Sequence, residues 1–263
     1  MNQTNPAAIL KPINQHCYDL AHGLEQISQE NTAYDWLEIA SAVKNVEIDI
    51  TRFDSAFGWC SEADHYQLSR QIILKKHVTN LTVFSYVWGA LEATIDSLSL
   101  APHPDKSRQG KINSACHAIS KYFDGRMTIA PYQEYVGRFS RLVINSEAYQ
   151  KIAAQLSLPA HIKPEAFGLY IVYKLRNEFA HGNTEFPRPD SENEPNSESP
   201  MIVEIATRIT LFSIQMLYLT CYADHDLPID VPFEDGGLEI QAKEWLRTVH
   251  FESTSSEGEI PAI

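Results

Sequence analysis

The sequence predicts an all-α protein, and three observations along its 263 residues agree on this fold class. Apolar residues recur at intervals of three and four, which is the spacing of one buried helix face. The alternation typical of strands never persists, and only 11 residues are glycine. Because the expected helices are joined as antiparallel neighbours, they should pack into an up-and-down bundle.

The first half of the chain is expected to contain one short helix and one very long helix. The short helix should span about 33–46. The long helix should run from 62 to 99, since its apolar residues keep the helical period throughout. Two prolines within 101–104 end it. Shorter helices are expected at 106–123, 131–144 and 147–156.

The second half should begin with a helix that starts at Pro164, because proline fits the first helical position. Gly182 is expected to end it as the C′ residue. Residues 183–200, rich in Pro, Ser, Glu and Asn, should form a flexible loop. An apolar helix at about 201–223 and an amphipathic helix at about 238–251 should follow, before a disordered tail.

We therefore expect three parts. Residues 1–60 form an N-terminal helical extension, 61–225 form the bundle, and 226–263 form the last helix and tail. The longest apolar stretch, 209–223, is too short for a membrane span and predicts a buried helix. The N-terminus lacks the features of a secretory signal. The four cysteines are scattered singly, which argues against disulfides and zinc. A cytoplasmic protein without a cofactor, metal or membrane partner is expected.

The net charge of −13 is unevenly distributed. Residues 106–176 contain eleven Lys/Arg and four Asp/Glu, a balance of +7, so the remainder carries −20. A locally basic surface attracts phosphate groups, although the same excess would also suit an ordinary solvated helix face. The acidic remainder would suit contact with a basic partner.

The most informative motif is Arg176–Gly182, with the sequence RNEFAHG. Arginine offers forked donors for phosphate oxygens, and histidine moves protons near neutral pH. Arg176 and His181 can therefore act without a metal on a phosphodiester, and RNA supplies the 2′-OH that this chemistry needs. At about 100° per residue, these two side chains lie about 140° apart around the helix, whereas Asn177 and His181 share a face. One helix alone offers an incomplete site.

The order R-N-x-x-x-H followed by Gly resembles the signature of HEPN domains, helical modules found in many prokaryotic ribonucleases and toxins, the Apea-like branch among them. The resemblance covers about 71–223 and includes the aromatic-rich segment 86–92. It implies an up-and-down helical bundle of HEPN type with extra N-terminal and inserted helices. It also implies a homodimer, in which two motif helices pair so that two arginines and two histidines line one cleft.

The resemblance further implies a metal-independent endoribonuclease, acting as a toxin or antiviral defence effector. Arg176 would hold the scissile phosphate, His181 would act as general acid or base, and Asn177 would orient His181 or bind phosphate. An antitoxin or another defence-system protein would be a partner besides the RNA substrate. Further substrate-binding candidates are Lys174, Glu92 as a partner of Arg176, His161 and Lys163.

Two alternatives stay open from the sequence. The chain could be a catalytically silent HEPN module that binds a nucleotide or serves as an assembly or regulatory subunit. It could also be a neutralising protein whose acidic surface binds a basic partner. In the first case Ala should be tolerated at Arg176 and His181; in the second, high salt should dissociate the complex.

Overall fold

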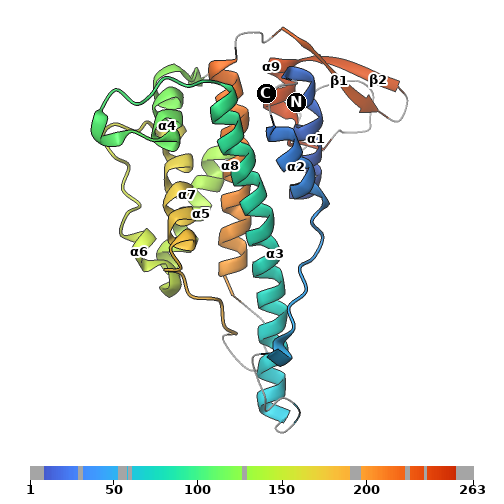
Figure 1. Ribbon diagram of the computed structural model, residues 1–263, viewed down its shortest axis with the longest axis vertical. Coiled ribbons are helices and arrows are strands. Elements are labelled where there is room, and N and C mark those ends of the chain that lie inside the picture. The colour runs from blue at the N-terminus through green and yellow to red at the C-terminus, as the bar shows by residue number, and fades with distance from the viewer. Residues whose placement is uncertain are drawn as a thin grey trace, which may run out of the picture.

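The structure is a computed structural model that describes residues 9–28, 32–52, 58, 61–125, 129–189, 197–222, 226–233 and 236–252. These residues are mostly helical, which confirms the all-α prediction. Figure 1 shows two long helices in the middle of the molecule, with a group of helices on either side. One continuous hydrophobic core includes residues from all three groups, from Cys17 to Val249.

The central pair consists of α3 (Ser61–Ser97) and α8 (Ser199–Cys221), both close to their predicted bounds. The N-terminal end of α3 projects beyond the other helices (Figure 1). By length and composition α8 could cross a membrane, but 94% of its most apolar window is buried inside the protein. Its apolar sequence is therefore explained by its place in the core, as the sequence predicted.

On one side of the central pair lie α4 (Lys111–Tyr122), α5 (Tyr132–Asn145), the short α6 (Gln150–Ala153) and α7 (Pro164–Ala180). Short 3-10 turns at Lys106–Arg108 and Glu147–Tyr149 replace the first turns of two predicted helices. Gly168 lets α7 approach α5 closely, because a Cβ there would lie 2.5 Å from the Tyr132 hydroxyl oxygen. This contact fixes the position of the motif helix.

On the other side lie α1 (Ile13–Ile27), α2 (Ala33–Ala42) and α9 (Ala242–Thr248). No helix was predicted over 13–27, although the buried residues of α1 follow the helical period. Together with α2 this helix packs into the common core, so the N-terminal extension is an integral layer of the fold.

The prediction of one helix over 238–251 is wrong in its first part. Strands β1 (Pro228–Phe233) and β2 (Gly236–Gln241) form an antiparallel hairpin, in which Ile229 pairs with Ile240 and Val231 with Leu238. The short alternation of apolar and polar residues in each segment is the period of a strand. Residues 190–196 of the predicted flexible loop and the predicted tail from 253 lie outside the described residues.

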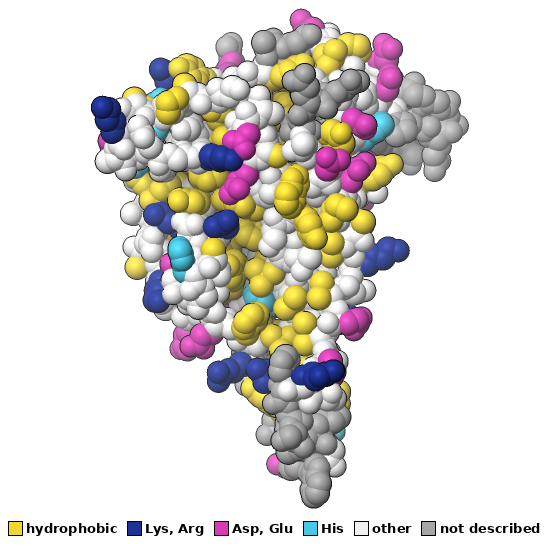
Figure 2. Space-filling model, in the orientation of Figure 1, with side chains coloured by type: hydrophobic (Ala, Val, Ile, Leu, Met, Phe, Trp, Pro, Cys, Tyr) yellow, Lys and Arg dark blue, Asp and Glu magenta, His cyan; other side chains and the backbone are white. Residues whose placement is uncertain are grey.

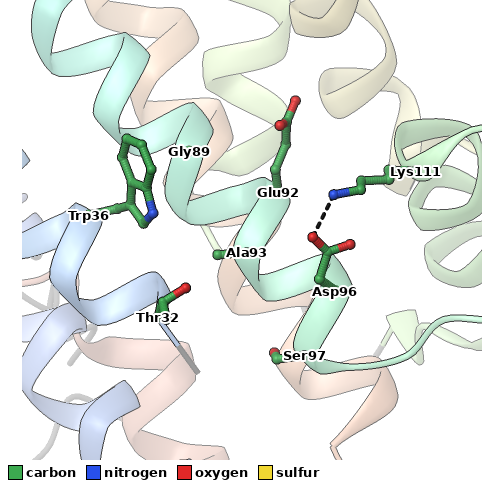
Figure 3. A pocket seen from close by; sticks show the side chains of 8 residues that line it. All are labelled: Thr32, Trp36, Gly89, Glu92, Ala93, Asp96, Ser97 and Lys111. Carbon is green, nitrogen blue, oxygen red and sulfur yellow. Dashed lines mark hydrogen bonds and ion pairs between the residues drawn. The ribbon is translucent and has the colours of Figure 1, made fainter. Parts of the chain in front are cut away.

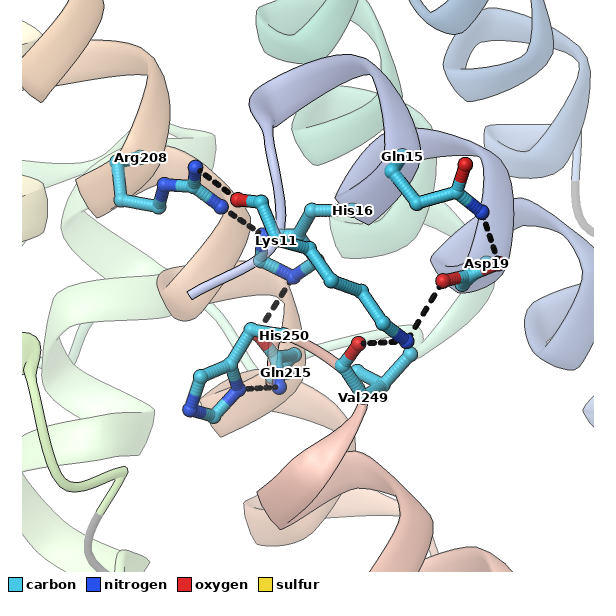
Figure 4. A network of polar contacts seen from close by, with 8 residues as sticks. All are labelled: Lys11, Gln15, His16, Asp19, Arg208, Gln215, Val249 and His250. Atoms are coloured by element: carbon cyan, nitrogen blue, oxygen red, sulfur yellow. Dashed lines mark hydrogen bonds and ion pairs between the residues drawn. The ribbon is translucent and has the colours of Figure 1, made fainter. Parts of the chain in front are cut away.

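A buried polar network ties both ends of the chain to α8 (Figure 4). Arg208 donates to His16 Nδ1 over 2.9 Å, and His16 Nε2 lies 3.1 Å from Gln215 Oε1. Gln215 in turn donates to His250 Nδ1 over 3.2 Å and to the carbonyl oxygen of Leu246. Arginine can only donate, so His16 Nδ1 accepts and His16 Nε2 carries the proton that faces Gln215 Oε1. His250 Nδ1 likewise accepts from Gln215. Both histidines are therefore neutral.

Candidate functional site

The motif helix α7 ends within the RNEFAHG segment, in a Schellman turn. Gly182 has φ +66°, and its N–H donates to the Phe179 carbonyl over 3.1 Å. The Asn183 N–H donates to the Glu178 carbonyl over 2.9 Å. These two bonds satisfy carbonyls that the helix end leaves free, and glycine adopts the left-handed conformation without strain. The prediction that Gly182 ends the helix is confirmed, and His181 is placed as the exposed C-cap residue.

Arg176 projects from α7 toward α3. Its guanidinium carbon lies 6.0 Å from the centre of the Trp88 ring, and that ring stacks on Tyr173 with an interplanar angle of 14°. The Trp88 indole N–H donates to a carboxylate oxygen of Glu92 over 2.7 Å. Since Trp88 is only 4% exposed, the indole is a fixed platform under the cation. Glu92, the predicted partner of Arg176, therefore contacts Trp88, and Trp88 contacts Arg176.

The motif side chains are free to bind a ligand. Among the described residues, no hydrogen bond or ion pair engages the side chains of Arg176, Asn177 or His181. A cation that lies over an aromatic face keeps the N–H groups at its planar edge available. Arg176 is therefore held in place by its stacking while its donors remain unused.

The structure does not bring Arg176 and His181 together within one chain. No contact between these two side chains is found in the described part of the protein, and Arg176 points into the angle between α7 and α3. His181 lies at the helix end, on the face that also carries Asn177, one turn earlier. Each chain therefore offers half of the expected constellation.

The other candidate residues fall into two groups. The Lys174 ammonium lies 5.1 Å from the centre of the Tyr170 ring, on α7 and close to the motif. His161 and Lys163 precede the first residue of the same helix. At 1.5 Å per residue, the length of α7 separates Lys163 from His181 by about 27 Å, and His161 precedes Lys163, so neither residue can contact the same phosphate as His181.

Charged side chains are unevenly distributed over the face in Figure 2. Figure 2 shows Asp and Glu gathered at the upper right, near α1, α2 and the hairpin, while Lys and Arg are more frequent on the side of α4 and α7. Apolar side chains form a band between them. Exposed large apolar side chains of the protein include Trp36 and Ile39 on α2 and Leu68 and Ile72 on α3.

A hollow of about 530 Å³ lies between α2 and α3 (Figure 3). Trp36 packs there against Gly89, and Lys111 forms an ion pair of 2.5 Å with Asp96. Asp96 and Glu92 raise the pKa of Lys111. With two carboxylates and one cation, this hollow disfavours phosphate, so the motif remains the candidate site.

Within the described residues, no group of three or more His, Cys, Asp and Glu is placed to hold a metal ion. Comparison of the chain with protein-family models, with curated proteins and with solved structures found no match. The platform under Arg176 could not be predicted from the sequence, because Trp88 has the pattern of a core residue and only the packing of α3 near α7 shows what lies above it.

Proposed function

We propose that this protein is a metal-independent endoribonuclease of HEPN type, which cleaves RNA through attack of the 2′-OH in a composite site of a homodimer. The observation that carries the proposal is the arrangement of the motif side chains. Arg176 is oriented by Trp88 with its donors free, and His181 stands exposed at a rigidly capped helix end. A phosphate binder and a proton-transfer group without protein partners favour chemistry on a phosphodiester.

The proposed reaction needs only these groups. One His181 removes the proton from the 2′-OH as the 2′-oxygen attacks phosphorus, and the bond from phosphorus to the 5′-oxygen breaks. A second imidazole donates a proton to the departing 5′-oxygen. Arg176 stabilises the charge that grows on the non-bridging oxygens, and Asn177 orients the imidazole or binds phosphate. The products are a 2′,3′-cyclic phosphate and a 5′-OH.

Dimerisation supplies the second imidazole. Arg176 and His181 diverge around α7, so two-fold pairing of motif helices would bring the arginine of one protomer toward the histidine of its partner. The band of apolar side chains on the face in Figure 2 supports association with another protein surface. A role as a toxin or antiviral effector, held in check by an antitoxin or another defence protein, follows from analogy with HEPN ribonucleases.

The test uses full-length protein, total tRNA and a structured mRNA in EDTA. Wild type, His181→Ala and Arg176→Ala are compared with His22→Ala, which alters an exposed histidine on α1. We expect cleavage by wild type and by His22→Ala, with cyclic or 3′-phosphate ends, and a loss of about 100-fold or more in the two motif variants. Equal cleavage by His181→Ala, or none by a folded wild-type dimer on any RNA, would refute the proposal in favour of a silent module.

A further inference from the structure

Three histidines from separate segments converge at the N-terminal end of α7. His103 lies in the connection after α3, His117 on α4, and His161 in the turn before α7. The ring centres of His103 and His117 are 5.0 Å apart, and those of His103 and His161 are 6.2 Å apart. The motif does not use this group of imidazoles, which we term the histidine cluster.

His103 is the fixed member of the histidine cluster. Its side chain is buried, with 7% of the residue exposed, and its Nδ1 accepts the Asp105 N–H over 3.0 Å. The backbone N–H of His103 donates to the Ser114 hydroxyl oxygen over 3.1 Å. Because Nδ1 is already an acceptor, the neutral ring carries its proton on Nε2 and has no free lone pair for a metal. His103 is therefore a hydrogen-bond donor at the centre of the histidine cluster.

Cations surround the histidine cluster. Burial lowers the pKa of His117, and His103 and Lys121 lower it further. Burial likewise lowers the pKa of His161, together with Arg108 and His103, while Asp105 opposes this effect. The carboxylate of Asp105 already accepts hydrogen bonds from Ser107 and lies 3.5 Å from Arg108. Protonated imidazoles here therefore need an anion from outside the chain.

A half-exposed stripe on α7 connects the histidine cluster with the motif. Its members are spaced by four and three residues, which keeps them within about 40° of one face. The 5.1 Å contact between Lys174 and the Tyr170 ring confirms that neighbouring members meet. None of them is buried. The stripe consists of Lys163, Phe167, Tyr170, Lys174, Asn177 and His181.

We propose that the histidine cluster binds the phosphate backbone of a single-stranded RNA segment, which then follows the α7 stripe to the cleavage site. The identity of the strand as RNA rests on the proposed nuclease function. Cations and imidazoles hold phosphates, and the aromatic rings of the stripe offer faces for bases. The distance of about 27 Å along α7 corresponds to roughly eight nucleotides at 3.4 Å each.

The test measures RNA binding in a His181→Ala background, which prevents cleavage, by fluorescence anisotropy at pH 7.5 and 6.0. The ligands are labelled single-stranded RNAs of 4 and 12 nucleotides. The double variant His117→Gln/His161→Gln is compared with the matched control His22→Gln/His65→Gln, which alters two exposed histidines. Circular dichroism and thermal melting confirm that each protein is folded.

We expect the parent and the control to bind the 12-mer about fivefold or more tightly at pH 6.0 than at pH 7.5, because bound phosphate favours imidazolium and so opposes the lowering of the pKa of His117 and His161. The double variant should bind the 12-mer equally at both pH values. In Lys163→Gln, the magnitude of the slope of log K against log salt should fall by about 0.7. The 4-mer should bind much more weakly. Equal pH dependence in the double variant and the control, or equal binding of both RNAs, would overturn the inference.

This outcome is independent of catalysis. If wild type cuts no RNA while the histidine cluster variants still lose pH-dependent binding, the nuclease proposal fails and the binding site stands. If wild type cuts RNA and the double variant binds as the control does, the nuclease stands and the histidine cluster has no role in binding.

Discussion

Acidification from pH 7.5 to pH 5.0 should remove much of the protein's stability, because three histidines are buried in the neutral form. His16 and His250 are fully buried and His77 is 2% exposed. Burial lowers the pKa of His77 to about 4 and that of His250 to about 3, and it places the pKa of His16 well below its ordinary value of 6.5. Arg208 reinforces the shift of His16 and His250.

The direction follows from proton binding. Above pH 6.5 the imidazoles are neutral in both the folded and the unfolded chain, so stability does not depend on them. Below pH 6.5 the unfolded chain takes up protons and the folded protein does not, which lowers the free energy of unfolding by about 1.4 kcal/mol per pH unit for each histidine. The loss continues to about pH 4 for His77 and about pH 3 for His250.

At pH 5.0 His77 and His250 should therefore each cost about 2 kcal/mol, or about 4 kcal/mol together, which is a large share of the stability of many domains. His16, whose pKa is lowered in the same direction, adds to this loss. Geometry gives the same sign, since protonated His16 Nδ1 or His250 Nδ1 would direct a hydrogen at the donors Arg208 and Gln215. Urea unfolding followed by circular dichroism at several pH values measures the free energy.

The slope should fall by about 1.4 kcal/mol per pH unit in His250→Asn, whose side-chain oxygen can replace the Nδ1 acceptor, and should be unchanged in His22→Asn. A wild-type stability that varies by less than about 1 kcal/mol between pH 7.5 and 5.0 would refute the reasoning. So would an unaltered slope in His250→Asn.

Two further changes test how α7 and Arg176 are held. Gly168→Ala should destabilise the protein by about 1–3 kcal/mol, because the new Cβ would lie 2.5 Å from the Tyr132 hydroxyl oxygen and α7 would be displaced. The matched control is Gly137→Ala, whose Cβ would lie 3.6 Å from its nearest neighbour and which should raise stability by about 0.5–1 kcal/mol. Thermal melting measures both variants, and equal effects would contradict the close approach of α7 to α5. Trp88→Phe weakens the aromatic platform under Arg176 and removes the indole N–H that donates to Glu92. The kcat/KM for RNA cleavage should therefore fall about fivefold. Unchanged cleavage would show that Trp88 does not position Arg176.

Much of the fold could be predicted from the sequence because it depends on local rules. The predicted bounds of α3 differ from the observed ones by only one or two residues, since a long periodic apolar stripe specifies a helix by itself. Pro164 and Gly182 likewise mark the ends of α7 through their own backbone preferences. The divergence of Arg176 and His181 around α7 could be predicted as well, because spacing along one helix sets which residues share a face.

Other features were decided by packing between distant segments. Periodicity reports which face of a helix is apolar but not which neighbour covers it, so the stack of Arg176 on Trp88 could not be read from the chain. The histidine cluster joins three segments whose separate spacings carry no signal. The hairpin Pro228–Gln241 is too short for its alternation to stand out from helical noise. The sequence by itself determined the all-α class and the ends of α3 and α7, because periodicity and terminal residues act locally. Only the tertiary structure decided which side chains meet, because contact depends on how helices far apart in the chain pack together.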